Sequence, residues 1–217
     1  RDFQNETENL GDELRVRVNA IADMYSAQGK QSSETPINGP LSPHRSFEWM
    51  RMPLEEIKEI RRGLQCTLND VVLTILTGAF REYLIYRRVA PDKIDFRAQT
   101  PVSVRTEKDK GQLGNRISSW LVDLPIDEED PLKQAGRIHQ ATQELKESRQ
   151  ALGVDMMMKA MSVMPTSLMS LGVQSASGAM STLVTNVPGP QFPLYLLGAE
   201  LLEMFPAVPL LQNVGVG

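Results

Sequence analysis

A stretch of 40 residues without a charged side chain, positions 160–199, most constrains how this chain folds. Such a stretch has to be buried, line an apolar cavity or contact lipid, because long uncharged segments are rarely left in water. It does not read as a membrane-spanning helix, since Pro165, Gly172 and Gly178 interrupt the apolar block of about 20 residues that a bilayer requires. We therefore expect this segment to contribute to a core or to an apolar channel.

The remaining composition is that of an ordinary globular protein, with 41% hydrophobic and 23% charged residues among 217. A net charge of -4 and the lack of a basic cluster with interleaved aromatic residues argue against a nucleic-acid partner. The single cysteine, Cys66, excludes an internal disulfide and fits a reducing compartment, so we expect a cytoplasmic protein. Because the chain begins at Arg1 and ends on an apolar, strand-like run, we interpret it as part of something longer.

Apolar periodicity predicts four helices. Apolar residues recur every three or four positions from Leu10 to Tyr25, which indicates an amphipathic helix. Pro53 suits the first turn of a helix over 54–64. Thr67, with Asp70 three positions later, resembles a capping box that opens a helix apolar nearly all round, which predicts a buried central helix. A solvated amphipathic helix is expected over 130–152.

Strands are predicted from alternating side chains, as in 45–52, and from β-branched runs, as in Leu183-Val184-Thr185. The expected strands cover 45–52, 94–104, 116–124, 183–185 and 194–204, and Pro188-Gly189 suits the centre of a type II turn. Helices and strands that mix without strict alternation favour an α/β fold, a mixed sheet covered by helices. A polar segment rich in Gly, Pro and Ser, residues 31–45, is expected to be a linker or crossover.

The sequence offers few catalytic parts. It contains no CxxC, HExxH or GxSxG motif, no phosphate-binding glycine loop and no pattern of metal ligands. His139 stands among polar residues of a helix, which predicts a solvated side chain. His44 is either a hydrogen-bonded linker residue or a general base, and Cys66 either a small core residue or a thiol made acidic by the following helix start.

Four motifs in order carry a resemblance to a known family. They are "NGPLSPHRSF", "TLNDVVLTILTGAFREYL", "TPVSVR" followed by "LGNRISSW", and "TNVPGP". Together they resemble the C-terminal half of the bacterial wax ester synthase/diacylglycerol acyltransferase family, from Asn38 to Gly217.

The resemblance implies a fold and a reaction. It implies one half of a chloramphenicol-acetyltransferase-like two-domain acyltransferase, with the active site in a tunnel between the halves. Residues 1–30 would then end the N-terminal half, and 46–217 would form the C-terminal domain, truncated at its end. The implied reaction transfers a fatty acyl group from acyl-CoA, a substrate, to a long-chain alcohol or diacylglycerol, with no cofactor. The family's HHxxxDG motif, which supplies the catalytic histidine, is absent here, so the chain is expected to be inactive without an N-terminal half as its partner.

The family's "ND" pair matches Asn69-Asp70. Asn69 would help catalysis, by a hydrogen bond to the thioester oxyanion or by orienting the absent histidine, or it would only support the helix start. Asp70 would contact substrate or, more simply, complete the Thr67 cap. Both interpretations stay open for each residue at this point.

Six further residues are candidate substrate contacts by resemblance. Arg105 and Asn115 would either bind substrate or order the chain inside the sheet. A strand is expected to emerge at the cleft at Thr185-Asn186, where the Pro188-Gly189 turn either fixes it against the acyl-CoA channel or is only a turn. Seven methionines between Met156 and Met180 would line the channel or a core.

Two other functions remain possible from the sequence. One is a condensation-type acyltransferase that takes its acyl group from a carrier protein. The other is a non-catalytic module that binds lipid or another protein, which the missing HHxxxDG motif favours. Because of the uncharged segment, we also expect a peripheral association with the inner membrane or with lipid droplets.

Overall fold

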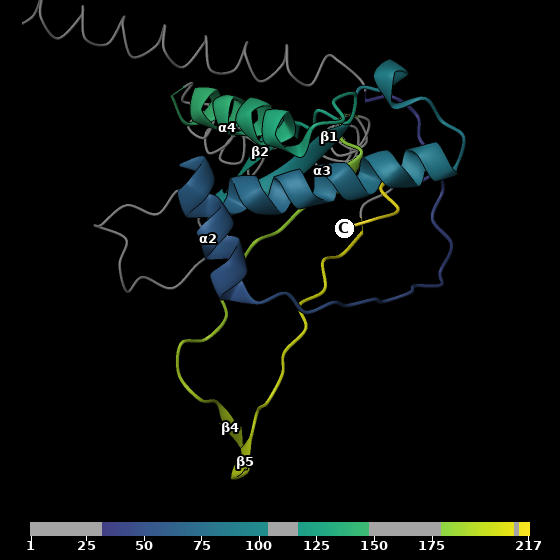
Figure 1. The fold of residues 1–217 in the computed structure, drawn as a ribbon. Helices are drawn as coiled ribbons and strands as arrows, with labels where there is room; N and C mark the ends of the chain where they lie inside the picture. The colour runs from purple at the N-terminus through teal and green to yellow at the C-terminus, as the bar shows by residue number, and fades with distance from the viewer. Residues whose placement is uncertain (1–31, 104–116, 148–178, 211–212) are drawn as a thin grey trace, which may run out of the picture.

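The computed structural model describes residues 32–103, 117–147, 179–210 and 213–217 (Figure 1). The elements in chain order are α2 (Leu54–Leu64), α3 (Leu68–Tyr86), the 3-10 turn η1 (Pro91–Lys93), β1 (Arg97–Ser103), β2 (Ile117–Asp123), α4 (Pro131–Glu147), β3 (Thr182–Leu183), β4 (Tyr195–Leu196) and β5 (Ala199–Glu200). The helix expected over 10–25 and the methionines from 156 to 169 lie outside the described residues.

The main sheet has the strand order β2-β1-β3 and is mixed, which confirms the predicted α/β class. Strand β1 runs antiparallel to β2, with Thr100 opposite Trp120, and parallel to β3. The carbonyls of Arg97 and Gln99 both accept hydrogen bonds from the β3 side, at 2.8 and 2.9 Å. Pro101 faces the same side two positions later, beyond the end of β3, so its missing N–H removes no ladder bond.

Helix α3 begins with the expected capping box. The backbone N–H of Asp70 donates to Thr67 Oγ1 at 3.1 Å, and the backbone N–H of Thr67 donates to Asp70 Oδ2 at 2.9 Å. The side chain of each residue thus accepts a hydrogen bond from the backbone N–H of the other, and both N–H groups would otherwise lack a partner at the helix start. Aspartate therefore serves here in the position that glutamate or glutamine usually holds.

The core lies between α3, α4 and the sheet. Its buried apolar side chains come from all three parts: Leu73, Leu84, Phe96, Ala98, Val122, Leu124, Ile126, Ile138 and Val184. The rings of Phe80 and Phe96 lie 4.8 Å apart and join α3 to the sheet. The expectation that α3 is buried all round is wrong, because Ile75 and Ala79 on its outer face are exposed. No single helix among the described residues is long and apolar enough to cross a membrane, and α2 and α3 reach that length only together, across a bend of 100°.

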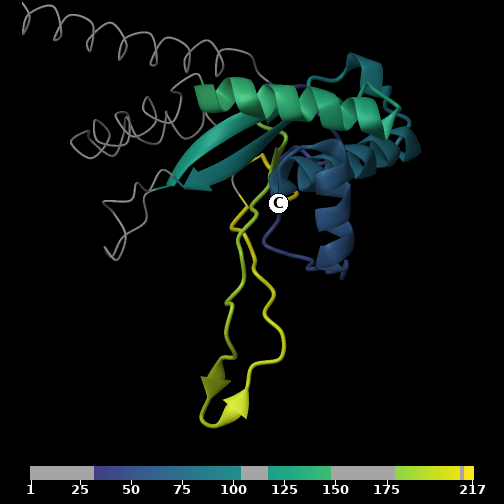
Figure 2. The ribbon, with the colours of Figure 1, turned by 60° about the vertical axis from the view of Figure 1, so that its left-hand side comes forward.

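An extended arm leaves the body after β3 and returns near residue 210, with the β4–β5 hairpin at its tip (Figures 1 and 2). The single strand expected over 194–204 is therefore wrong. Leu197 and Gly198 have φ angles of 53° and 84°, which suit the two central positions of a hairpin turn, so the chain reverses there. Gly189 does not have a positive φ, and the type II turn expected at Pro188-Gly189 is absent from the described backbone.

The expected strand over 45–52 is also wrong. This segment is extended but pairs with no strand in the part of the chain that the structure describes. Its aromatic residues lie against the returning arm instead: the rings of Phe47 and Trp49 lie 6.4 and 5.4 Å from the ring of Phe205. Alternating side chains favour an extended backbone, but a strand also needs a partner with free backbone groups.

Candidate functional site

A cavity of about 340 Å³ lies beside α3 and has a mostly apolar wall. Four segments that are distant in sequence line it: Val72, Leu76 and Phe80 from α3; Thr182, Leu183, Val184, Thr185 and Val187 from β3 and the start of the arm; Pro206, Ala207 and Val208 from its return; and Val216 and Gly217. A concave, apolar surface of this size is typical of a site for an apolar ligand. The cavity includes the strand end that the sequence predicted at a cleft.

Asn69 stands on the helix face that borders this cavity. Asn69, Val72, Leu76 and Phe80 follow one another at intervals of three, four and four positions, so they share one face of α3. Asn69 is not itself a lining residue but lies one turn before Val72, is partly exposed, and its side chain has no hydrogen-bond partner among the described residues. An amide in this place is free to donate to a group that enters the cavity, although its catalytic role stays a prediction.

The other candidate contacts are distributed unevenly. Thr185 lies in the wall of the cavity, whereas Asn186, Pro188 and Gly189 continue from it as exposed, extended chain. Arg105 and Asn115 lie outside the described residues. The structure thus brings Thr185 and the Asn69 face of α3 to one cavity, and leaves substrate contact by the whole set a prediction.

Asp70 faces α4 rather than the cavity and is completely buried. Its Oδ2 accepts from the backbone N–H of Thr67 and from His139 Nδ1, at 2.9 and 2.8 Å, and its Oδ1 accepts from Thr142 Oγ1 at 2.8 Å. Burial alone would raise the pKa of this carboxyl, but the hydrogen bonds from His139, Thr67 and Thr142 outweigh it and lower the pKa below its ordinary value. Asp70 is therefore an ionised, fully partnered carboxylate inside the protein.

The prediction that His139 is solvated is wrong. Its side chain is only 34% exposed and pairs with Asp70, which stands 69 positions earlier in the chain. An ionised carboxylate only accepts hydrogen bonds, so the contact assigns the ring hydrogen to Nδ1. The sequence around His139 shows no carboxylate partner for it, because packing of α4 on α3 creates this pair.

The other two reactive candidates have simple surroundings. His44 is an exposed linker residue, and its backbone N–H donates to Ser42 Oγ at 3.3 Å. Burial raises the pKa of the Cys66 thiol, and the Asp70 carboxylate raises it further. The thiol is therefore not activated by the helix start, which favours the small packing residue over the reactive one.

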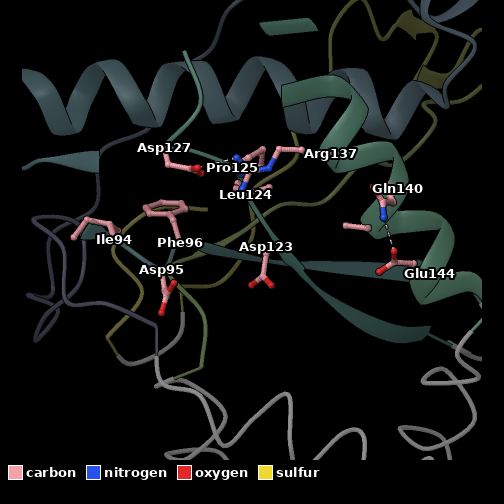
Figure 3. Close-up of a pocket in the computed structure, with 11 residues that line it drawn as sticks. Ile94, Asp95, Phe96, Asp123, Leu124, Pro125, Asp127, Arg137, Gln140 and Glu144 are labelled. Carbon is pink, nitrogen blue, oxygen red and sulfur yellow. Dashed lines mark hydrogen bonds and ion pairs between the residues drawn. The ribbon is translucent and has the colours of Figure 1, made fainter. Parts of the chain in front are cut away.

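A second cavity, of about 350 Å³, has a polar wall and lies between the edge of the sheet and α4 (Figure 3). Four carboxylates line it, from Asp95, Asp123, Asp127 and Glu144. Arg137 donates to Asp127 at 2.8 Å and lowers the pKa of that carboxyl. No sequence-predicted site residue lies in this wall, and no group of three potential metal ligands gathers in the part of the chain that the structure describes. The apolar cavity is therefore the stronger candidate.

Two family models match this chain in succession. Residues 7–72 match the wax ester synthase/diacylglycerol acyltransferase catalytic domain, and residues 113–217 match the C-terminal domain of the same family. The chain belongs to this wax ester synthase/diacylglycerol acyltransferase family. Asn69 and Asp70 fall inside the match to the catalytic domain, and the arm falls inside the match to the C-terminal domain.

Curated members of the family align with most of this chain. It is 30% identical, over 203 residues, to a probable diacylglycerol O-acyltransferase of Mycobacterium tuberculosis. That alignment covers 92% of this chain and 44% of the relative. It is 32% identical, over 174 residues, to the O-acyltransferase WSD of Acinetobacter baylyi, with 79% of this chain and 37% of that protein covered. The chain thus spans less than half the length of these relatives.

A solved structure supports the fold. The wax ester synthase/diacylglycerol acyltransferase from Marinobacter aquaeolei VT8 matches with a TM-score of 0.54 and 20% identity, over 86% of this chain and 43% of that one. The match supports the mixed α/β fold, which this chain shares with that structure over most of its length.

Proposed function

We propose that this chain supplies part of the active site of an O-acyltransferase that moves a fatty acyl group from acyl-CoA to a long-chain alcohol or diacylglycerol. The observation that carries the proposal is the apolar cavity beside the Asn69 face of α3. Relatives named as diacylglycerol O-acyltransferases and as an O-acyltransferase support the same class of reaction. In this proposal the cavity holds part of an acyl or alkyl chain.

The proposed chemistry is direct transfer. A histidine outside this chain, in the HHxxxDG motif of the family, takes the proton of the acceptor hydroxyl. The acceptor oxygen then attacks the thioester carbon, the C–S bond breaks, and the CoA thiolate leaves and takes up a proton. The side-chain amide of Asn69 would donate a hydrogen bond to the thioester oxygen, which becomes negative during the attack.

An N-terminal half of the family is the proposed partner. The described part of this chain has one partly exposed histidine, which is tied to Asp70, and one histidine on an exposed linker. Its arm also presents large apolar side chains to water: Val187, Phe192, Tyr195, Leu196, Leu197, Leu201, Leu202, Met204 and Phe205. Uncovered apolar surface on this scale marks an interaction site.

The test is an assay of the chain with palmitoyl-CoA and hexadecanol or dipalmitoylglycerol, alone and fused to the N-terminal half of a relative. We expect turnover only by the fusion, because base catalysis and the pairing of two substrates each contribute 10²–10⁴-fold or more. Turnover by the chain alone that is lost in His44→Ala would overturn the missing-base argument. A monodisperse fusion that binds acyl-CoA without turnover would favour a lipid-binding module.

Asn69→Ala in the active fusion tests the oxyanion role. Loss of a preorganised donor should lower kcat by about 10²–10³ and leave the melting temperature nearly unchanged. Support of the helix start alone predicts the opposite pattern, a loss of about 1 kcal/mol in stability with kcat unchanged.

A peripheral contact with lipid is also proposed, because the uncharged segment and the apolar arm lie in one chain. Cell fractionation should release the protein from membranes or droplets in a high-salt, alkaline wash. Retention in the washed pellet, as for an integral protein, would contradict it.

A further inference from the structure

We propose that His139 is a positioning residue, which acts through Asp70 to set how the start of α3 presents Asn69 to the apolar cavity. The inference rests on the proposed function only for the catalytic consequence. Its structural part stands on the contacts between α3 and α4, and can be tested without turnover.

The contacts join the two helices at one point. The carboxylate of Asp70 receives one hydrogen bond from its own helix start, through Thr67, and two from α4, through His139 and Thr142. All three donor distances lie between 2.8 and 2.9 Å. Losing any one of these donors would leave a buried, charged oxygen without its hydrogen bond, which costs free energy. The three bonds therefore fix both the position and the rotation of the first turn of α3.

The rotation of that turn determines where Asn69 points. Consecutive residues of a helix are turned about 100° from one another, so a side chain that is fixed at position 70 also fixes the direction at position 69. Asp70, Leu73 and Thr77 form the buried face, while Val72 and Leu76 line the cavity. Asn69 continues the face of Val72 and Leu76 one turn earlier, at the rim of the cavity. Loosening the Asp70 contacts would let the first turn rotate or fray, and Asn69 would move with it.

His139 does not act directly on a substrate in this arrangement. Its Nδ1 is committed to Asp70, and its partly exposed side chain lies on α4, which meets the buried face of α3 rather than the cavity face. The geometry therefore separates His139 from a general base, although a histidine paired with a buried carboxylate suggests one at first sight.

The experiment compares His139→Leu with His139→Asn. Leucine removes the donor to Asp70, whereas asparagine places an amide N–H near the position of Nδ1 and restores it. Lys146→Leu is the matched control, because Lys146 lies seven positions later on the same side of α4, is exposed, and has no ion pair or hydrogen bond among the described residues. The side-chain amide signal of Asn69, identified by its loss in Asn69→Ala, is followed by NMR in the fusion of this chain with the N-terminal half.

We expect the Asn69 signal to shift in His139→Leu, to return toward its original position in His139→Asn, and to stay in place in Lys146→Leu. In the active fusion, His139→Leu should lower kcat by about 10- to 100-fold with KM nearly unchanged, because a misplacement of about 1 Å is enough for such a loss. The same substitution in an Asn69→Ala background should have little further effect.

Three results would overturn the proposal. An unchanged Asn69 signal in His139→Leu would show that the pair does not hold Asn69, whatever the enzyme does. A loss of kcat that persists in the Asn69→Ala background, and that His139→Asn does not rescue, would assign His139 a direct catalytic role. A lower melting temperature of His139→Leu with unchanged kcat would show that His139 stabilises the fold without positioning Asn69. A fusion without turnover whose Asn69 signal still responds as expected would reject the proposed function and keep the positional inference.

Discussion

Adjacent residues at the start of α3 have different tasks because a helix turns them to different neighbours. Asn69 stands on the face of the apolar cavity, with its amide free of partners in the described part of the chain. Asp70 is fully buried and has three donors. A buried carboxylate loses its hydration, and hydrogen bonds from the protein have to replace it, so donors must stand at defined positions around it. The pair "ND" thus combines a partly exposed amide with a buried carboxylate whose hydrogen bonds hold the start of the helix.

Asp70→Asn should make the stability of the chain less dependent on pH. The folded pKa of Asp70 is lowered, so the ionised carboxylate stabilises the fold fully above the ordinary aspartate pKa of about 3.9, and this contribution is lost as the pH falls through the folded value. We expect Asp70→Asn to lower the free energy of unfolding by about 1.5–3 kcal/mol at pH 7. The difference in this free energy between the variant and the original protein, called the gap below, should narrow below pH 4.

Urea unfolding of both proteins at pH 7, 5 and 3 measures this gap. Asp92→Asn is the control, because Asp92 is exposed and outside the network. A gap of constant size across this range would contradict the assignment of an ionised, partnered Asp70.

At the scale of elements, short segments that are distant in sequence close the cavity by hydrogen bonds. The Nδ2 of Asn38 donates to the carbonyl of Ser181, just before β3, at 3.0 Å, and to the carbonyl of Asn213 at 2.9 Å. The backbone N–H of Gly215 donates to the carbonyl of Ile37 at 2.9 Å. The linker around Asn38 therefore holds the C-terminal segment beside β3, where Val216 and Gly217 complete the cavity wall.

Asn38→Asp should destabilise the chain more than Asn38→Ala. Alanine removes the two hydrogen bonds donated to these carbonyls and the one that Oδ1 accepts from Thr35 Oγ1, which costs about 1–3 kcal/mol. Aspartate adds a negative oxygen that faces the same two carbonyls, at nearly the position of the lost donor. Urea unfolding gives both differences, and Asn186→Asp, which changes the charge equally on the exposed arm, serves as the control. Equal losses in Asn38→Asp and Asn186→Asp would contradict the role given to the amide.

At the scale of the whole molecule, the described part is a compact body with a long apolar arm, shown in Figures 1 and 2. Leu202 at the tip is 84% exposed and Leu197 is fully exposed. Their neighbours Glu200 and Glu203 are the only charged residues of the arm, so few of its side chains are well solvated in water. Exposed apolar surface on this scale marks the arm as an interaction site, which is where the proposed N-terminal partner would bind.

The isolated chain should self-associate through the arm. Leu197→Arg with Leu202→Arg should shift the size-exclusion profile toward monomer at unchanged melting temperature, because both side chains are exposed and outside the core. Ala79→Arg, which adds a positive charge to the exposed face of α3, should leave the profile as it was. Monomer in the original chain, or equal profiles in all three proteins, would count against the arm as an association surface.

The sequence determined the elements whose signals are local. The capping residues Thr67 and Asp70 and the apolar periodicity predicted α2 and α3, and the segments over 94–104 and 116–124 predicted β1 and β2. Pro53, expected in the first turn of α2, is its extended N-cap residue instead. The four motifs also identified the family and the fold, because ordered motifs record constraints that periodicity does not contain.

Only the tertiary structure decided what depends on contacts between distant segments. The sequence near His139 contains no sign of Asp70, and alternation over 45–52 contains no sign that a pairing strand is lacking. The chain reverses at Leu197-Gly198, where both φ angles are positive, rather than at Pro188-Gly189. Local preferences select the conformation of a few residues, but the free energy of a buried carboxylate or an apolar cavity wall depends on which elements meet, and that is settled only when the chain packs.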